Sequence, residues 1–146
     1  MTIQMLLASS FLAGVIGGCA SRTDATLDAL VDYQLLGSEA TQRTTMHIEP
    51  DGTVTRTNAP GPAETATLDP ATLDDVARKI DDANFPTLEA MYGCGGCADD
   101  AVYTISVKID RTAYTVQADS TANLPDRLRP VIDTLHDISE LSLDWH

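Results

Sequence analysis

The stretch Tyr103-Thr104-Ile105-Ser106-Val107-Lys108-Ile109 carries the strongest strand pattern in this chain of 146 residues. Apolar and polar side chains alternate along it, which is the period of a strand with one buried face. Asp110-Arg111-Thr112 predicts a turn. The alternation resumes beyond the turn, at Tyr114, Val116 and Ala118. The stretch therefore predicts an antiparallel hairpin whose apolar face must be covered by a second layer.

Two amphipathic helices are predicted to form that layer. Asp69-Pro70 has the residue types of a helix N-cap and first position, and this helix is expected to end near Ala83-Asn84. Its apolar face consists of Leu73, Val76, Ala77 and Ile80. The second helix has its own apolar face of Leu124, Leu128, Val131, Leu135 and Ile138. Pro125 can open this second helix, whereas Pro130 either kinks it or opens its main part after a loose first turn.

Three more strands are predicted in the first half of the chain, at residues 29–36, 41–48 and 53–57. Glu49-Pro50-Asp51-Gly52 joins the last two by a tight turn. Residues 58–62 predict a loop, and residues 64–68 a short edge strand. The expected fold class is α+β, with the order strand, hairpin, helix, hairpin, helix. We expect an antiparallel sheet of four to five strands with both helices on one face, in a single domain spanning residues 29–146.

The N-terminal segment predicts export. Residues 1–18 carry no charged side chain and are shorter than the about 20 apolar residues of a membrane span, which is typical of a signal peptide. The segment closes with Ile16-Gly17-Gly18-Cys19, which resembles the lipobox of bacterial lipoproteins. This resemblance implies that Cys19 becomes the first mature residue and carries a diacylglycerol and an acyl chain such as palmitate. Residues 19–28 would then be a lipidated tether, and Ala20 implies the periplasmic face of the outer membrane in a Gram-negative cell envelope.

The composition excludes several function classes. The formal net charge is -13, so the surface repels nucleic acid. There is no G-x-S-x-G turn and no Gly-rich phosphate loop between a strand and a helix. The adjacent acidic pairs Asp81-Asp82 and Asp99-Asp100 do not imply a paired acid–base site, because neighbouring strand residues point to opposite faces. We therefore expect a protein that is not an enzyme, with no cofactor.

Cys94-Gly95-Gly96-Cys97 is open to three interpretations. A short-range structural disulfide fits an exported protein best. A redox dithiol needs the first cysteine at a helix N-terminus, whereas here acidic residues and a strand follow. A zinc site needs a second ligand pair, but Cys19 is taken by lipid and His47, His136 and His146 are scattered, so no metal is expected.

The order of elements across residues 30–138 carries a family resemblance. The residues that carry it are Tyr33-Gln34-Leu35-Leu36-Gly37-Ser38, residues 46–54, Leu68-Asp69, Phe85, Tyr92, Asp100, Tyr103-Thr104-Ile105-Ser106-Val107, Tyr114-Thr115-Val116 and Leu124-Pro125. The chain resembles emfourin-like domains, small bacterial proteins named for a proteinaceous inhibitor of thermolysin-family metalloproteases. This resemblance implies a protein–protein contact that blocks a secreted metalloprotease. The candidate partner-binding loop is Gly37, Ser38, Glu39 and Arg43.

The functional expectation is a lipid-anchored envelope protein with a protein-binding domain that inhibits a thermolysin-like metalloprotease. Two alternatives remain open. One is a structural or accessory envelope lipoprotein without inhibitory activity, and the other is a redox protein that uses Cys94 and Cys97.

The lipidation hypothesis predicts the effect of Cys19→Ser. Without the thiol no diacylglycerol can be attached, so the variant should remain unprocessed or leave the membrane fraction. Metabolic labelling with a fatty acid, followed by membrane fractionation, measures this. Labelling and membrane association that persist in the variant would contradict the hypothesis.

Overall fold

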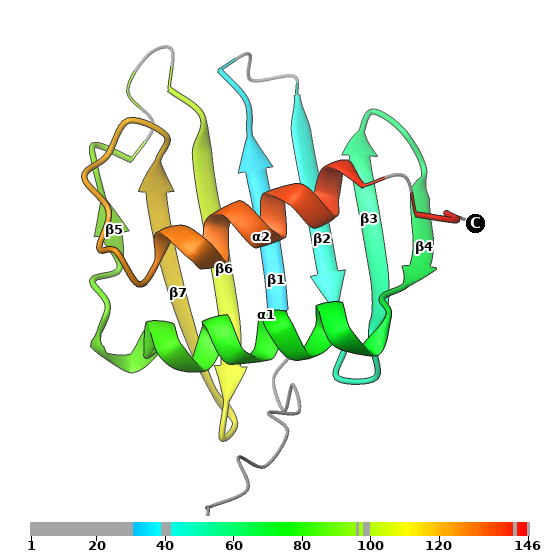
Figure 1. Cartoon of the computed structure of the whole chain (residues 1–146). Coiled ribbons are helices and arrows are strands. Elements are labelled where there is room, and N and C mark those ends of the chain that lie inside the picture. Colours follow the sequence, from blue (N-terminus) through cyan, green and yellow to red (C-terminus); the bar gives the residue numbers. More distant parts are fainter. Residues whose placement is uncertain (1–30, 39–41, 96, 98–99, 142, 146) are drawn as a thin grey trace, which may run out of the picture.

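The computed structural model describes residues 31–38, 42–95, 97, 100–141 and 143–145. These residues form one seven-stranded sheet and two α-helices, and Figure 1 shows both helices on the same face of the sheet. The strands are β1 (Val31–Leu36), β2 (Arg43–Ile48), β3 (Thr53–Ala59), β4 (Ala63–Thr67), β5 (Met91–Tyr92), β6 (Val102–Ile109) and β7 (Thr112–Asp119). The helices are α1 (Pro70–Ala83) and α2 (Arg129–Glu140), with a short 3-10 turn η1 (Phe85–Thr87) after α1. The strand order is β4-β3-β2-β1-β6-β7-β5.

The α+β class is confirmed, but the expected sheet of four to five antiparallel strands is wrong. The described sheet has seven strands and is mixed, because β5 runs parallel to β7. The edge strand expected at 64–68 is present as β4, paired with β3. β5 has only two residues, Met91 and Tyr92, opposite Gln117 and Ala118. Two residues carry no periodicity, so the sequence pattern could not reveal this strand.

The predicted hairpin is confirmed as β6 and β7. Ile105 lies opposite Val116, and Val107 opposite Tyr114, which brings the apolar side chains onto one face. Asp110 and Arg111 both have positive φ, at 48° and 69°. A two-residue turn of this kind matches the twist of the two strands it joins. Strand β7 continues to Asp119, one residue beyond Ala118, where the predicted alternation ends.

Strand β1 joins the two halves of the sheet. It pairs antiparallel with β2 on one side and with β6 on the other. Tyr33 therefore lies opposite both Met46 and Ile105, and its side chain is buried. Residues separated by more than 70 positions in the chain are brought into one layer by this strand.

The helix boundaries follow the predicted capping residues. The Asp69 carboxylate accepts a hydrogen bond from the Thr72 backbone N at 3.0 Å, and this bond and the one from the Thr72 hydroxyl lower the pKa of Asp69. Asn84 ends α1 in the left-handed conformation. The main part of the second helix begins at Arg129 and Pro130, after a turn, so the second of the two interpretations of Pro130 is confirmed.

The hydrophobic core lies between the sheet and the helices. Alternate residues of the central strands point into it, and the apolar faces of α1 and α2 close it. Its largest fully buried side chains are Tyr33, Phe85, Met46, Ile48, Ile105, Leu128, Leu135 and Ile138. Within the described residues, neither α1 nor α2 combines the length and the apolar character needed to cross a membrane.

The opposite face of the sheet is polar. In the described part of the chain no helix covers it (Figure 1). Its rows consist mainly of hydroxyl and amide side chains. His47 and Asp32 pair across it, with 2.6 Å between Nδ1 and Oδ1. Ser106 and Thr115 share a hydrogen bond of 2.8 Å. An antiparallel sheet with one solvated face accounts for this pattern.

The C-terminal segment packs back onto the sheet. The Arg56 guanidinium lies 3.9 Å from the ring centroid of Trp145, which is a cation–π contact. Arg56 also donates to the Ser139 carbonyl at 2.7 Å and pairs with Glu64 at 2.8 Å. One side chain on β3 therefore ties the end of α2 to the edge strand β4.

Tyr33 predicts a pH dependence of stability. Burial, with Tyr103 and Glu140 nearby, raises the pKa of the Tyr33 phenol well above its ordinary value. Above about pH 10 the unfolded chain releases this proton while the folded protein keeps it, so the free energy of unfolding falls by up to about 1.4 kcal/mol per pH unit. Tyr33→Phe should remove this part of the decline, measured by urea unfolding from pH 8 to pH 11. Equal declines in both proteins would contradict the assignment.

Candidate functional site

Four connections leave from one end of the sheet. Leu36, the last residue of β1, lies opposite Arg43 of β2 and Val102 of β6. Arg43 lies opposite Ala59, the last residue of β3, and Val102 lies opposite Asp119, the last residue of β7. The connections β1–β2, β3–β4, β5–β6 and β7–α2 therefore leave from the same end, which we call the loop end (Figure 1).

The chain enters the sheet at the other end. Val31 lies opposite Ile48 and Val107, next to the two hairpin turns that follow β2 and β6. The loop end is thus separated from the first described residue by the whole length of β1. At about 3.3 Å per residue, six residues span roughly 20 Å.

The candidate binding loop belongs to the loop end. Gly37 donates its backbone N–H to the Gln42 carbonyl at 2.9 Å, which closes the base of the loop. Ser38 and Arg43 are exposed to solvent. Glu39, the fourth predicted residue, and Cys19, the predicted lipidation site, lie outside the described residues.

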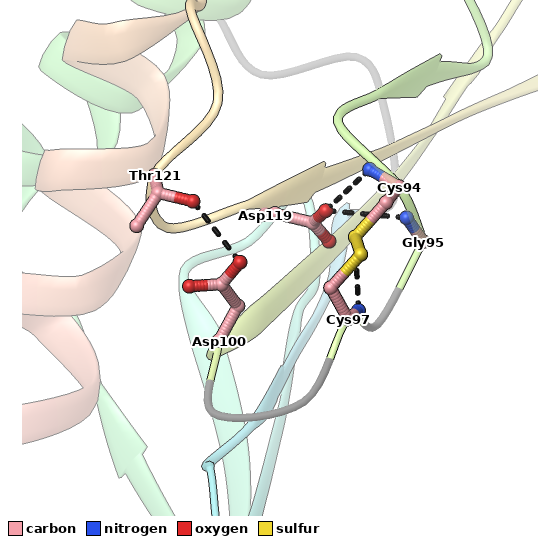
Figure 2. Close-up of a disulfide and its surroundings, with 6 residues drawn as sticks. All are labelled: Cys94, Gly95, Cys97, Asp100, Asp119 and Thr121. Atoms are coloured by element: carbon pink, nitrogen blue, oxygen red, sulfur yellow. Dashed lines mark hydrogen bonds between the residues drawn. A yellow bond between two sulfur atoms is a disulfide. The ribbon is translucent and has the colours of Figure 1, made fainter.

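The Asp119 carboxylate is the buried anchor of the loop end. Its residue is only 2% exposed. Its Oδ2 accepts hydrogen bonds from the backbone N of Cys94 at 2.6 Å and of Gly95 at 3.2 Å (Figure 2). A buried carboxylate is costly unless charge-assisted bonds compensate for lost water. These bonds therefore fix the cysteine loop onto the end of β7.

Two glycines permit this close approach. Gly93 and Gly95 have φ of +99° and +72°, in the region that favours glycine. A Cβ on Gly93 would overlap the Asp119 carboxylate. Gly93 thus has a steric reason that involves a residue on another strand, whereas a Cβ on Gly95 would meet the Met91 side chain.

Cys94 and Cys97 are joined in a disulfide, with 5.7 Å between their Cα atoms. The pairing expected for an exported protein is therefore present. The Cys97 backbone N donates to Cys94 Sγ at 2.9 Å, and both residues are exposed. Cys94 lies in a bend after β5 and does not begin a helix, so the helix dipole that activates a redox dithiol does not act on it.

Asp100 also lies close to the disulfide (Figure 2). Its Oδ2 accepts a hydrogen bond from the Thr121 hydroxyl at 3.0 Å, and its backbone N donates to the Cys97 carbonyl at 3.2 Å. One ligand atom from each of Cys94, Asp100 and Asp119 lies within 4.8 Å of the others. Figure 2 shows both carboxylates on the same side of the disulfide. The loop end thus gathers two carboxylates and two cysteine sulfurs, here joined in a disulfide, and carboxylates and cysteine thiolates both bind metal ions.

Sequence reasoning missed both carboxylates as site residues. Asp119 lies one residue beyond Ala118, where the predicted alternation ends, and it is a buried strand residue. The hairpin register offered a signal for Asp119. Counting residue pairs away from the turn, from Ile109 opposite Thr112, places Asp119 opposite Val102 as the last pair of the two strands. Asp100 was judged as half of an adjacent pair on a strand, whereas it precedes β6 and bonds with Thr121.

No protein-family model matches this chain, and no curated protein matches it. The resemblance to emfourin-like domains therefore stays a prediction based on the motifs alone.

Gly93→Ala should destabilise the protein by about 1–3 kcal/mol, because the positive φ and the Asp119 carboxylate both oppose a side chain. Gly37→Ala is the matched control, since its Cβ would meet the adaptable Gln42 side chain at 3.3 Å without a positive φ. Its expected cost is below about 1 kcal/mol. Urea unfolding with the disulfide intact measures both, and equal costs would refute the steric account.

Proposed function

We propose that this chain is a lipid-anchored, protein-binding module of the bacterial cell envelope, which contacts its partner through the loop end. The partner class we propose is a secreted thermolysin-like metalloprotease, which the domain inhibits. The lipid anchor rests on the Ile16–Cys19 motif, and the partner class rests on the emfourin-like resemblance.

The separation of the two ends of β1 is the observation that carries this proposal. The chain enters at Val31, and the loop end begins beyond Leu36. A tether attached ahead of Val31 would hold the domain by one end and present the loop end away from the membrane. This arrangement suits a loop cluster that must meet another protein.

The preorganisation of the loop end also supports the proposal. The hydrogen bonds to Asp119 fix Cys94 and Gly95 at the end of β7, and the disulfide joins Cys97 to Cys94. The Gly37–Gln42 hydrogen bond closes the neighbouring connection. Loops that are already ordered lose less conformational entropy when a partner binds, so more of the contact energy appears as affinity.

The charge distribution favours this end over the helical layer. Acidic side chains lie along the exposed sides of both helices, for example Asp81, Asp82, Asp133 and Asp137. The candidate loop instead carries one cation, Arg43, and one acidic residue, Glu39. A partner with an acidic rim around its binding cleft would therefore meet less repulsion here than at the helices.

The test uses two charge reversals at opposite ends of the sheet. Arg43→Glu changes the loop end, and Arg111→Glu makes the same change in the β6–β7 turn at the far end. We expect Arg43→Glu to weaken inhibition of a thermolysin-like protease by about tenfold, which is about 1.4 kcal/mol. Arg111→Glu should leave the inhibition constant unchanged.

Binding is measured with the full chain in detergent, by inhibition assays against a panel of thermolysin-like enzymes and by pull-down from an envelope extract. If no enzyme is inhibited but Arg43→Glu abolishes capture of another protein, the protease assignment is wrong. The proposal that the loop end contacts a partner protein is then retained. If neither assay distinguishes the two variants, the binding module itself is refuted, and an accessory envelope lipoprotein becomes the better description.

A further inference from the structure

The strongest unassigned chemistry in the molecule lies around Cys94. Three potential ligand atoms lie within 4.8 Å of one another there, from Cys94 in the loop after β5, Asp100 before β6 and Asp119 at the end of β7. Cys97 is a fourth candidate, because the disulfide joins it to Cys94. The zinc interpretation of the sequence lacked a second ligand pair. The fold supplies that pair as two carboxylates.

We propose that the reduced loop end is a metal site, in which the thiolates of Cys94 and Cys97 and the carboxylates of Asp100 and Asp119 bind a divalent ion of borderline softness, with Zn²⁺ the best fit. The inference does not depend on partner binding at the same end.

The donor set selects the ion. Two thiolates exclude Ca²⁺ and Mg²⁺, which require oxygen ligands. Two carboxylates disfavour Cu⁺, which prefers sulfur alone. Zn²⁺ accepts both donor types in a tetrahedral set of four, and a C-x₂-C spacing is usual for its paired cysteines.

The surrounding hydrogen bonds suit such a site. The Cys94 and Gly95 amides orient the Asp119 carboxylate. The Cys97 amide donates to Cys94 Sγ. The Thr121 hydroxyl orients Asp100 in the same way.

The disulfide and the metal-bound form exclude each other. An external dithiol reductant transfers two electrons to the Cys94–Cys97 bond. The S–S bond breaks, two protons give two thiols, and the reductant becomes a disulfide. When Zn²⁺ binds, both thiol protons leave to solvent and two Zn–S bonds form. Metal occupancy therefore depends on the redox state of this pair.

The test uses Co²⁺ as a spectroscopic probe for the zinc site. The full chain is reduced with a phosphine, stripped of metal and titrated with Co²⁺ under anaerobic conditions. We expect equimolar binding, with thiolate-to-cobalt charge transfer in the near ultraviolet and the intense visible bands of tetrahedral Co²⁺. Added Zn²⁺ should displace the Co²⁺, and the oxidised protein should give no such spectrum.

Conservative substitutions decide whether the two carboxylates are ligands. Asp100→Asn and Asp119→Asn should each weaken Co²⁺ affinity at least about tenfold, because the loss of a group that only supports a metal ligand already costs about that much. Asp110→Asn, in the exposed turn at the far end, is the matched control and should bind as the wild type does. Circular dichroism of each metal-free variant establishes that it is folded.

Two results would overturn the proposal. One is a reduced wild type that gives no charge-transfer band. The other is unchanged affinity and band shape in both Asp100→Asn and Asp119→Asn, since the carboxylates would then not be ligands. Asp100 is the safer of the two changes, because it is only half-buried and its loss leaves the Asp119 anchor in place.

Discussion

The double pairing of β1 is the constraint on which the rest of the structure depends. This strand bonds to β2 and to β6, and so fuses two hairpins that are far apart in the chain into one sheet. The register places Tyr33 between Met46 and Ile105 in the core. It also aligns the ends of four strands, which is why the connections that leave them meet at one end of the molecule (Figure 1).

The loop end has its own internal constraint in the Asp119 carboxylate. A buried anion must be compensated, and the amides of Cys94 and Gly95 do this. Gly93 then follows from sterics, because a side chain on it would overlap the carboxylate. The same anchor that fixes the cysteine loop also brings a carboxylate close to the disulfide. The proposed partner-binding end and the proposed metal site thus share one local structure.

The molecule is polarised in two directions. Across the sheet, the core and both helices occupy one face, and hydroxyl and amide groups the other. Along the strands, the chain enters at Val31 and the loop end lies beyond Leu36. The second direction matters for the proposed function, since a tethered domain has one end near its anchor and one end free for contact.

The sequence by itself determined the local elements of this protein. The alternation at 103–109, the Asp69-Pro70 cap and the C-x₂-C spacing are signals between near neighbours, and each is realised in β6, α1 and the disulfide. Only the tertiary structure decided that β5 adds a parallel edge and that Asp100 and Asp119 reach Cys94. A two-residue strand is too short to show a sequence period. Asp119 and Cys94 are 25 positions apart and are brought together by strand pairing, which the residues next to either one do not encode.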